Sequence, residues 1–491
     1  MQVSVVAFQR LNHEFRIDAE YYREEVLNKL NVLDKHNKDD LENLVDFVIG
    51  PFGSTVTVDQ YSDNSDYRYV RNKDINDFLI KDVDLALIPK AVYEELPKYH
   101  IRENDLLITV VGTLGKVAIA TKKDTNSIFS CKSTIIRTRN INPFYLLTYL
   151  NTNTGKLFSL RGKRGAIQEG LNLPDLKEIQ VFIPSNEFQK QIEAIIKLSF
   201  DGTKKATGLF EEAQNILLSE LGLTHWQPKH QLTFIKNYSD TQKSGRIDAE
   251  YYQPKYDEII KAIKSYSGGW DTLGNLVHLK DKNYTPKSDK EYKYLELSNI
   301  AGNGEITGCM YEFGNELPSR ARRIVASGDV IVSSIEGSLS SIALVGREYN
   351  NVLCSTGFYV IRSNSFNSET LLVLMKSIAG QMLLKKGCNG TILTAINKDE
   401  FKNIVLPKIT EEKQLEIQQK VTESFNLRKQ SKHLLESAKK AVEMAIEQDE
   451  QTAIKWLKKQ GVSQQKNKGS ASKKTRGQPN KGSASLIFRP K

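Results

Sequence analysis

The heptapeptide Arg-Ile-Asp-Ala-Glu-Tyr-Tyr stands at residues 16–22 of this chain and again at residues 246–252. With about 20 residue types, chance would repeat a heptapeptide in roughly one in 10,000 chains of this length, so an internal duplication has to be considered first. The similarity continues downstream, where residues 112–119 match residues 337–344 at an offset of about 225 positions. The chain of 491 residues is therefore predicted to consist largely of two copies of one domain.

The two copies share a framework and differ in their variable parts. Apolar positions keep their spacing, whereas residues 55–100 and 278–325 hardly align beyond a few positions. Function is therefore expected where the copies differ. The polar and glycine positions that repeat at one offset are Arg137 with Arg362, Gly155 with Gly380, Gly162 with Gly387, Gly165 with Gly390 and Asn172 with Asn397.

Each copy begins with a polar amphipathic stretch and continues with short apolar runs between turn residues. The stretches 18–33 and 248–265 are expected to form short helices. These patterns predict an α+β fold with a mainly antiparallel sheet in each copy. Strand-like runs stand at 106–111, 133–137, 330–332 and 359–362, and helical spacing returns at 144–158 and 368–386.

A long helix is predicted after each copy. Residues 187–221 contain only Gly202 and Gly208 as helix-breaking residues, and residues 411–459 contain no glycine or proline. Both stretches carry apolar residues at spacings of three and four. At 1.5 Å per residue these helices would be about 50 and 70 Å long. Neither has a core of its own, so another surface must cover the apolar stripe. That surface is either a second chain, in a coiled-coil arm, or the other long helix of the same chain.

The positive charge is concentrated at the C-terminus. The formal net charge is +10, but residues 461–491 hold eight basic residues and no acid, which leaves 61 basic and 59 acidic residues before them. This Gly, Ser and Lys-rich tail is predicted to be disordered, and it either adds nonspecific attraction to phosphates or keeps the protein in solution. No apolar run spans a membrane and residues 1–10 do not resemble a signal peptide, so we expect a cytoplasmic protein.

The motifs of several enzyme classes are incomplete. Gly115-Lys116 lacks the rest of a phosphate-binding loop, and Asn142-Pro143-Phe144-Tyr145 lacks the second proline of an amino-methyltransferase site. The four cysteines form no Cys-x-x-Cys pair, so neither a disulfide framework nor a metal site is predicted. Asp18 and Glu20 are two positions apart and would diverge on a helix, which favours a packing role for the heptapeptide, with Arg16 paired to a nearby acid. No catalytic residue is predicted.

The order of these features resembles the specificity subunit of type I restriction-modification enzymes, over about residues 10–460. The resemblance rests on the order of several motifs, most of which recur in the two halves. They are the heptapeptide, Gly-Pro-Phe-Gly-Ser at 50–54, Gly-Asp-Val-Ile at 328–331 with its counterpart at 104–107, and Gln191-Ile192 and Gln414-Leu415 near the start of the long helices.

The resemblance implies a division of the chain into five parts. Residues 1–184 would be a first target-recognition domain and residues 223–409 a second one, related by a pseudo-twofold repeat. Residues 185–222 and 410–460 would be spacer helices that pack as an antiparallel coiled coil, and residues 461–491 would be the basic tail. Each domain would read one half of a split double-stranded DNA target, and the helices would fix the distance between the half-sites.

The resemblance also implies partners. Two methyltransferase subunits and motor-nuclease restriction subunits would join this chain, and S-adenosylmethionine, ATP and magnesium would be used by those partners. This chain would then be a non-catalytic DNA-binding subunit of a restriction and DNA methylation system. Two alternatives stay open: a coiled-coil scaffold that does not read DNA, and a specificity subunit that serves a fused restriction-methylation enzyme.

Basic and amide side chains in the variable parts and in the repeated glycine loops are the candidates for DNA contact, because such groups reach phosphates and base edges. The strongest cluster is Arg161 to Gly165, whose counterpart 385–390 also combines glycine with positive charge. The candidates are Arg68, Arg71, Lys73, Arg161, Lys163, Arg164 and Gln168 in the first copy, and Lys280, Lys282, Lys287, Arg320, Arg322, Arg323, Lys385, Lys386 and Asn389 in the second.

Overall fold

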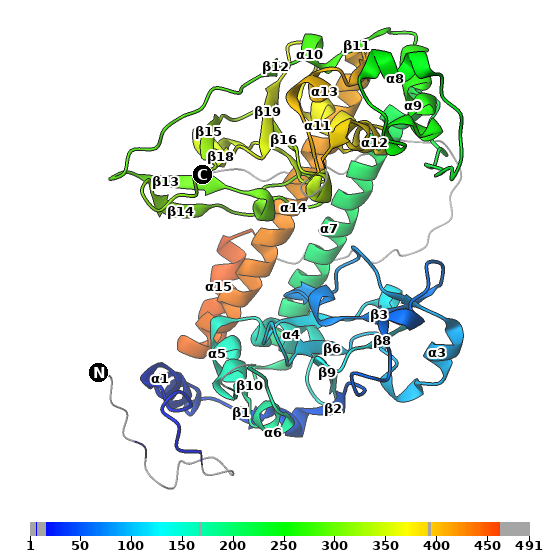
Figure 1. The fold of residues 1–491 in the computed structure, drawn as a ribbon. Helices are drawn as coiled ribbons and strands as arrows, with labels where there is room; N and C mark the ends of the chain where they lie inside the picture. The colour runs from blue at the N-terminus through cyan, green and yellow to red at the C-terminus, as the bar shows by residue number, and fades with distance from the viewer. Residues whose placement is uncertain (1–5, 7–15, 166–168, 391–393, 462–491) are drawn as a thin grey trace, which may run out of the picture. The chain divides into compact units, whose positions relative to one another are not determined.

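The computed structural model describes residue 6 and residues 16–165, 169–390 and 394–461, and it divides into two compact units. The first unit comprises residues 1–201 and 430–491, and the second comprises residues 202–429 (Figure 1). Each unit holds one copy of the repeat. The two long helices are divided between the units, and the core of each unit contains a part of both helices.

The first unit is built on a five-stranded sheet with the strand order β2-β9-β6-β7-β4, antiparallel except for the pair β4 and β7. A three-stranded sheet, β5-β3-β8, and the antiparallel pair β1 and β10 complete the strands. The bounds are β1 Lys38–Asp40, β2 Val45–Ile49, β3 Tyr67–Val70, β4 Phe78–Leu79, β5 Leu87–Ile88, β6 Leu106–Thr109, β7 Val117–Ile119, β8 Ser127–Phe129, β9 Ser133–Thr138 and β10 Gln180–Phe182.

Helices α4 and α5 bury Tyr145 and Tyr149 against this sheet, and the Tyr145 hydroxyl donates to the carbonyl of Phe182 at 2.7 Å. Asn142 caps α4, since its side chain accepts from the backbone N–H of Phe144 and of the following residue. The helix bounds are α1 Glu24–Leu33, α2 Leu41–Leu44, α3 Lys90–Glu94, α4 Pro143–Leu150, α5 Asn153–Arg161 and α6 Leu173–Lys177.

The second unit repeats this plan with two four-stranded sheets, β12-β19-β16-β17 and β14-β13-β18-β15. Among the described strands of this unit only β13 and β18 pair in parallel, so the predicted α+β fold with mainly antiparallel sheets is confirmed. The strands are β11 Trp270–Thr272, β12 His278–Leu279, β13 Glu291–Leu295, β14 Met310–Phe313, β15 Ala321–Val325, β16 Val330–Ser333, β17 Ile342–Leu344, β18 Val352–Ser355, β19 Phe358–Arg362, β20 Cys388–Asn389, β21 Ala395–Ile396 and β22 Val405–Pro407. The helices are α8 Tyr238–Ser244, α9 Pro254–Lys264, α10 Leu273–Leu276, α11 Ser368–Lys376, α12 Ile378–Gly387 and α13 Lys398–Lys402.

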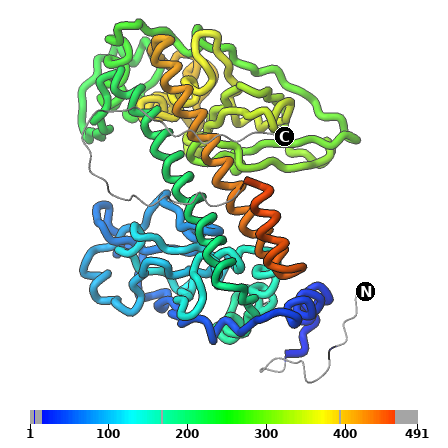
Figure 2. The backbone as a smooth tube through the Cα atoms, turned by 180° about the vertical axis from the view of Figure 1, so that it is seen from behind, coloured from blue at the N-terminus to red at the C-terminus, as the bar shows by residue number. Residues whose placement is uncertain are grey.

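The long helices α7 (Asn186–Glu220) and α14 (Glu411–Glu447) pack on each other inside each unit. In the first unit the Ser199 hydroxyl donates to the carbonyl of Ser431 at 2.9 Å. In the second unit the rings of Phe210 and Phe425 stack with centroids 6.5 Å apart. Figures 1 and 2 both show the two helices side by side in each unit. The apolar stripe predicted on each helix is therefore covered by the other helix of the same chain.

The C-terminal helix does not run to residue 459 as predicted. It stops at Glu447, and α15 (Glu450–Lys459) folds back on it, with the Lys440 ammonium group 5.1 Å from the centre of the Trp456 ring (Figure 1). The cause is an N-cap, because the Asp449 side chain accepts from the backbone N–H of Thr452. Because α15 folds back, its apolar residues pack into the core of the first unit.

The helices expected at 18–33 and 248–265 begin later in the structure than predicted. The α-helices begin only at Glu24 and at Pro254. The first heptapeptide lies in a turn, and the second ends in one turn of 3-10 helix, Glu250–Tyr252. In the first copy the Asp18 carboxylate accepts from the backbone N–H of Tyr21 and so closes the turn. This side-chain acceptor competes with helical hydrogen bonding.

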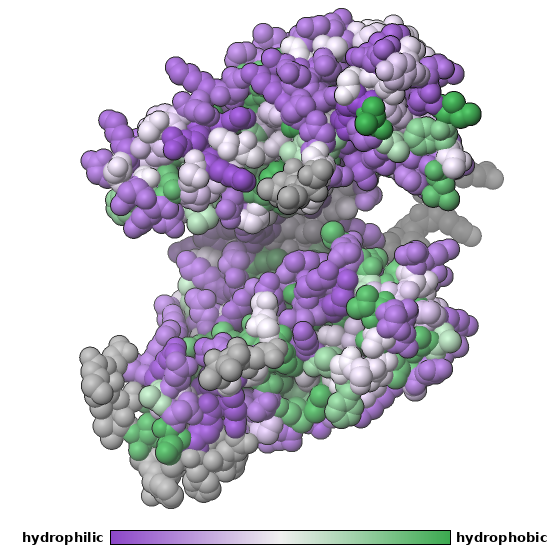
Figure 3. All heavy atoms as spheres, in the orientation of Figure 1, coloured by the Kyte–Doolittle hydropathy of each residue, from purple (hydrophilic) through white to green (hydrophobic). Residues whose placement is uncertain are grey.

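Few large hydrophobic side chains are strongly exposed. In Figure 3 hydrophilic residues predominate on the visible face of the second unit, whereas hydrophobic groups lie between them on the first. Within the described ranges no helix has the length and apolar character needed to cross a bilayer. The large hydrophobic residues exposed by 86% or more are Ile17, Phe52, Leu232, Ile235 and Ile247.

Candidate nucleic-acid interface

The first heptapeptide is clamped onto the glycine loop that follows α5. Arg16 bonds Asp18 at 2.8 Å, donates to the carbonyl of Gly162 at 3.3 Å and pairs with the buried carboxylate of Asp175 at 3.1 Å. The Arg161 guanidinium lies 3.7 Å from the centre of the Tyr21 ring and donates from Nε to the Tyr21 carbonyl. The expectation that the heptapeptide packs and that Arg16 pairs with an acid is confirmed.

The second heptapeptide is held by the corresponding contacts. Arg246 bonds Asp248 and donates to the carbonyls of Lys386 and Cys388, at 3.5 and 2.8 Å. The Lys386 ammonium group lies 3.2 Å from the centre of the Tyr251 ring, where Arg161 lies in the first unit. Both clamps thus join the same segment to the same loop.

A buried aspartate anchors the loop before the central strand of each unit. Asp105 is 1% exposed and accepts two hydrogen bonds from Arg137, both of 2.8 Å. Asp329 is fully buried and accepts from Arg362 and from Lys280, again at 2.8 Å. These side chains are therefore part of the framework that the repeat keeps.

Three loops meet beside this framework in each unit, and we call them the loop rim. In the first unit the rim consists of residues 110–116, 130–132, 162–165 and 169–171, and in the second of residues 334–341, 355–357, 387–390 and 394–396. The same two backbone bonds join the loops in both units. They are Val110 N–H to Lys132 C=O with Leu171 N–H to Val110 C=O, and Ser334 N–H to Gly357 C=O with Ile396 N–H to Ser334 C=O, all 2.8–2.9 Å.

Further loops border the rim and differ between the units. In the first unit Gly50 packs so closely that a Cβ atom there would lie 2.3 Å from the carbonyl oxygen of Ser130, and the Asn72 amide donates to the carbonyl of Val111. In the second unit the carbonyl of Arg320 accepts from Thr356 N–H. The framework is thus shared, whereas the side chains presented around the rim are not.

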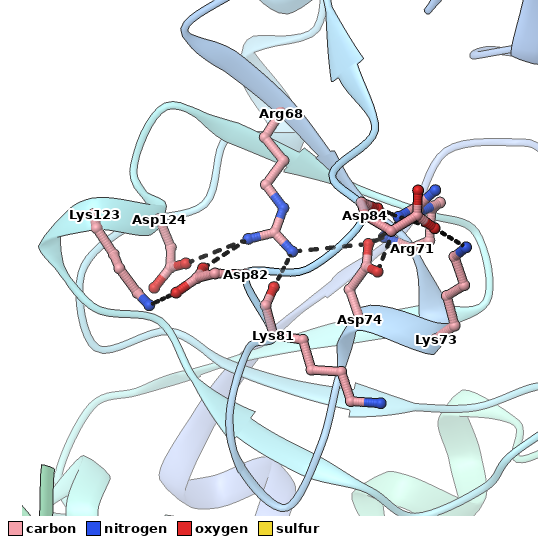
Figure 4. Close-up of polar contacts among 9 residues, drawn as sticks. All are labelled: Arg68, Arg71, Lys73, Asp74, Lys81, Asp82, Asp84, Lys123 and Asp124. Atoms are coloured by element: carbon pink, nitrogen blue, oxygen red, sulfur yellow. Dashed lines mark hydrogen bonds and ion pairs between the residues drawn. The ribbon is translucent and has the colours of Figure 1, made fainter. Parts of the chain in front are cut away.

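Arg68, Arg71 and Lys73 lie in an ion-pair network rather than on an open basic surface (Figure 4). Arg68 is 7% exposed and faces Asp82 at 3.4 Å, with Asp74 and Asp124 slightly further away. Arg71 and Lys73 pair with Asp74 and Asp84, and Lys123 pairs with Asp82, so four aspartates balance four cations in this network. A phosphate would have to compete with these carboxylates.

The cations of the glycine loop are also engaged within the first unit. Arg164 forms two hydrogen bonds with Asp175, of 2.8 and 3.0 Å, and Lys163 pairs with Glu169 at 2.6 Å. Burial lowers the pKa of the Arg161 guanidinium, which lies under the heptapeptide. Gly162 serves internal packing, since a Cβ there would lie 2.3 Å from the Asp175 side chain. Gln168 lies outside the described residues.

The candidates of the second unit fall into two groups. Lys280 is bound to Asp329, Lys386 to the Tyr251 ring, and Arg323 donates to the Phe358 carbonyl at 2.6 Å, so these are framework residues. Arg322 donates to the carbonyl of Ser319. The others form no side-chain hydrogen bond or ion pair with any described residue; they are Lys282, Lys287, Arg320, Lys385 and Asn389.

Lys132 is a rim residue that sequence reasoning missed. Its side chain is exposed and makes no hydrogen bond or ion pair within the described part of the chain, while its carbonyl joins two rim loops. The signal was present, because Lys132 aligns with Gly357 and so is a position at which the two copies differ. Side chains of this kind suit phosphate or base contacts better than the buried arginines do.

Among the described residues no group of three or more His, Cys, Asp or Glu side chains could hold a metal ion. Cys354 and Cys388 are buried, and Cys131 and Cys309 are half-buried. What the rim offers is a set of loops with exposed amide, hydroxyl and ammonium groups.

The sequence of this chain is similar to those of known proteins. Residues 17–206 match the model of the type I restriction modification DNA specificity domain. The putative type I restriction enzyme MjaX specificity subunit of Methanocaldococcus jannaschii is 22% identical over 438 residues, which cover 86% of this chain and 96% of that protein. The EcoBI specificity subunit of Escherichia coli is 28% identical over 124 residues, or 25% of this chain and 26% of that one.

The chain is also similar, at low TM-scores, to solved structures of type I restriction-modification S subunits. The S subunit of a type I restriction-modification system from M. genitalium has 13% identity and a TM-score of 0.39, with 84% of this chain and 95% of that chain covered. The HsdS subunit from Thermoanaerobacter tengcongensis also has 13% identity, with a TM-score of 0.28 and coverage of 84% and 97%. Residues 17–206 thus match a type I restriction modification DNA specificity domain, and over most of its length the chain is similar to a putative type I restriction enzyme specificity subunit.

Proposed function

We propose that this chain is the DNA sequence-specificity subunit of a type I restriction-modification complex and that it reads a bipartite DNA target with one unit per half-site. The observation that carries the proposal is the pair of loop rims. Each is joined by the same backbone hydrogen bonds, yet the two present different side chains. A shared framework with divergent loops suits two domains that do the same task on different sequences.

The base-reading groups belong to the exposed part of the rims and their borders. Arg, Lys, Asn and Gln reach base edges in the major groove, and lysine also neutralises phosphates. In the first unit Lys132 and the exposed loop 112–113 fit this role. In the second unit Arg320 and Asn389 fit it, with Lys282 and Lys287 on the segment before β13. The buried or bound cations would instead hold these loops in shape.

The partners complete the reaction. Two methyltransferase subunits and restriction subunits would dock on this chain, and S-adenosylmethionine, ATP and magnesium would be bound by them. The nearly even balance of 61 basic and 59 acidic residues before the tail supports a shared DNA clamp, because phosphate affinity grows with the number of charges neutralised. This chain supplies sequence choice and catalyses no step.

A competition binding assay tests this function. The chain and its methyltransferase partner are bound to a labelled duplex that carries the methylated motif of the host, and unlabelled duplexes with the motif or with random sequence compete. We expect the motif duplex to compete at least a thousandfold better at physiological salt, as is typical of specific DNA binding. If random duplexes competed equally well, the chain would not read DNA sequence. The alternative of a coiled-coil scaffold would then be favoured.

A further inference from the structure

The heptapeptide is identical in the two copies even at positions whose side chains are exposed and so do not hold the framework together. Arg16, Tyr21 and Tyr22 are largely buried in the first clamp, and the arginine of the second copy is 10% exposed, so their identity follows from their contacts. Ile17 and Ile247, in contrast, are 86% and 90% exposed. The alanine two positions further on is exposed in both copies as well.

An exposed isoleucine is under no internal constraint. A large apolar side chain in water contributes nothing to the core, and surface substitutions usually change stability by less than about 0.5 kcal/mol. Only two residues after the heptapeptide, Glu24 and Glu25 of the first copy face Pro254 and Lys255 of the second. The isoleucine is thus kept at an exposed position although the sequence diverges directly after the heptapeptide, which points to a contact outside the chain that is the same for both copies.

We propose that Ile17 and Ile247 are the centres of two equivalent docking sites for one protein subunit that binds this chain in two copies. Each copy of that partner would offer an apolar socket for the isoleucine. The inference rests on the proposed function, in which the partner is the methyltransferase subunit. It assigns a contact to that partner outside the long helices.

The carboxylates beside each isoleucine define the rest of the surface. The side chains of Asp18 and Asp248 are 46% and 48% exposed although each bonds the arginine of its heptapeptide. Glu20 is also exposed, at 62% of its side chain. A socket on the partner with lysine or arginine at its edge is the complementary surface.

In the first unit a groove continues the docking surface. It has a volume of about 740 Å³ and begins with Arg23, the residue directly after the heptapeptide. It runs along α1 to the end of α14, and both helices belong to the first unit. Such a groove gives the partner a larger contact than one side chain. Its lining residues are Arg23, Glu24, Glu25, Asn28, Lys29, Val32 and Glu447.

The test uses the full-length chain and the methyltransferase subunit of the same restriction-modification system. Native mass spectrometry counts the methyltransferase copies bound to the wild type, to Ile17→Asp, to Ile247→Asp and to the double variant. We expect two copies on the wild type and one on each single variant at concentrations that saturate the wild type, because burying a charge in an apolar socket weakens a site by roughly a hundredfold or more. The double variant should hold none.

Val58→Asp and Tyr311→Asp are the matched controls, since these side chains are 76% and 57% exposed and lie outside the heptapeptides. They should bind two copies with wild-type affinity, and all variants should keep the wild-type melting temperature. Two copies bound with wild-type affinity by the isoleucine variants would overturn the docking sites and leave the proposed function intact. A wild-type chain that binds no methyltransferase subunit would contradict the proposed function, and the docking sites with it.

Discussion

The two units of this chain hold their heptapeptides in the same way but present different side chains on their rims. Arg161 covers Tyr21 in the first unit, and Lys386 covers Tyr251 in the second. Lys132 stands where the second unit has Gly357. Positions with buried partners thus repeat in kind, whereas exposed rim positions are free to change. The comparison separates the residues that build a recognition domain from those that give it a target.

Removing the buried aspartate should have the largest effect, and a similar one in both units. Asp105→Ala leaves the Arg137 guanidinium without its carboxylate, and Asp329→Ala leaves both Lys280 and Arg362 without theirs. Breaking a buried ion pair at one partner costs about 3–5 kcal/mol, so each variant should lower the free energy of unfolding of its own unit by that amount. Hydrogen exchange read segment by segment in urea measures it.

Asp63→Ala is the control for this pair, because Asp63 is exposed and forms no ion pair with a described residue. If Asp105→Ala lowered the free energy of unfolding of its unit by less than about 1 kcal/mol, Asp105 would not anchor the loop. Asp105 and Asp329 would then not play the same role in the two units.

The paired glycines at the starts of α5 and α12 should give the next largest effect. A Cβ on Gly155 would lie 2.0 Å from the carbonyl oxygen of Tyr149, and one on Gly380 2.1 Å from that of Leu374. Substitution by alanine should therefore cost about 1–3 kcal/mol in either unit. In Gly208→Ala the new methyl group meets no atom within 4 Å, so this helical position should gain up to about 1 kcal/mol. Thermal unfolding of the three variants compares them directly, and equal melting temperatures would refute the close packing.

Lys132→Ala should weaken DNA binding by about 1 kcal/mol and reduce the slope of log affinity against log salt by about one, while stability stays unchanged. The reason is that Lys132 is exposed on the rim with its ammonium group unbound by described residues. Lys35→Ala, at an exposed lysine beside the end of α1, is the control. Fluorescence anisotropy at several salt concentrations measures both, and an unchanged slope for Lys132→Ala would remove the loop 130–132 from the interface.

The cation on the heptapeptide tyrosine should give an effect that is visible as a pH dependence of stability. Burial lowers the pKa of Lys386 to about 8, below its value of 10.5 in the unfolded chain. Between pH 8 and 10.5 the unfolded state therefore binds more protons at this position, so its contribution makes the folded state more stable as the pH rises. Lys386→Arg, which imitates Arg161, stays charged and should lose this gain. The difference in unfolding free energy between wild type and variant should shift toward the wild type from pH 7 to pH 10; a difference independent of pH would contradict the lowered pKa.

The repeat made the architecture predictable. Identical spacing of Gly155, Gly162 and Gly165 with their counterparts gave the duplicated α+β units, and the apolar stripes gave helices where α7 and α14 lie. The fold-back at Asp449 was not foreseen, because a single capping side chain, rather than a glycine or proline, ends the helix. The pattern also gave no sign that the helices would be divided between the two units.

The candidate site was harder to predict than the fold. Charge alone cannot distinguish a surface lysine from an arginine such as Arg68 that lies among aspartates brought together from distant parts of the sequence. Those contacts depend on how β3 and its neighbouring loops fold. Comparison of the two copies was the better guide, since it separates Lys132 from the cations that the framework uses.

One measurement tests most directly that each unit reads its own half of the target. Residues 40–184 are replaced by the matching residues of a relative with another target, and the genomes of strains with the wild-type or the exchanged chain are sequenced by a method that detects methylated bases. The account predicts a split methylated motif in both strains, in which only one half and not the spacing between the halves has changed. A change in both halves, or a motif without two parts, would contradict it.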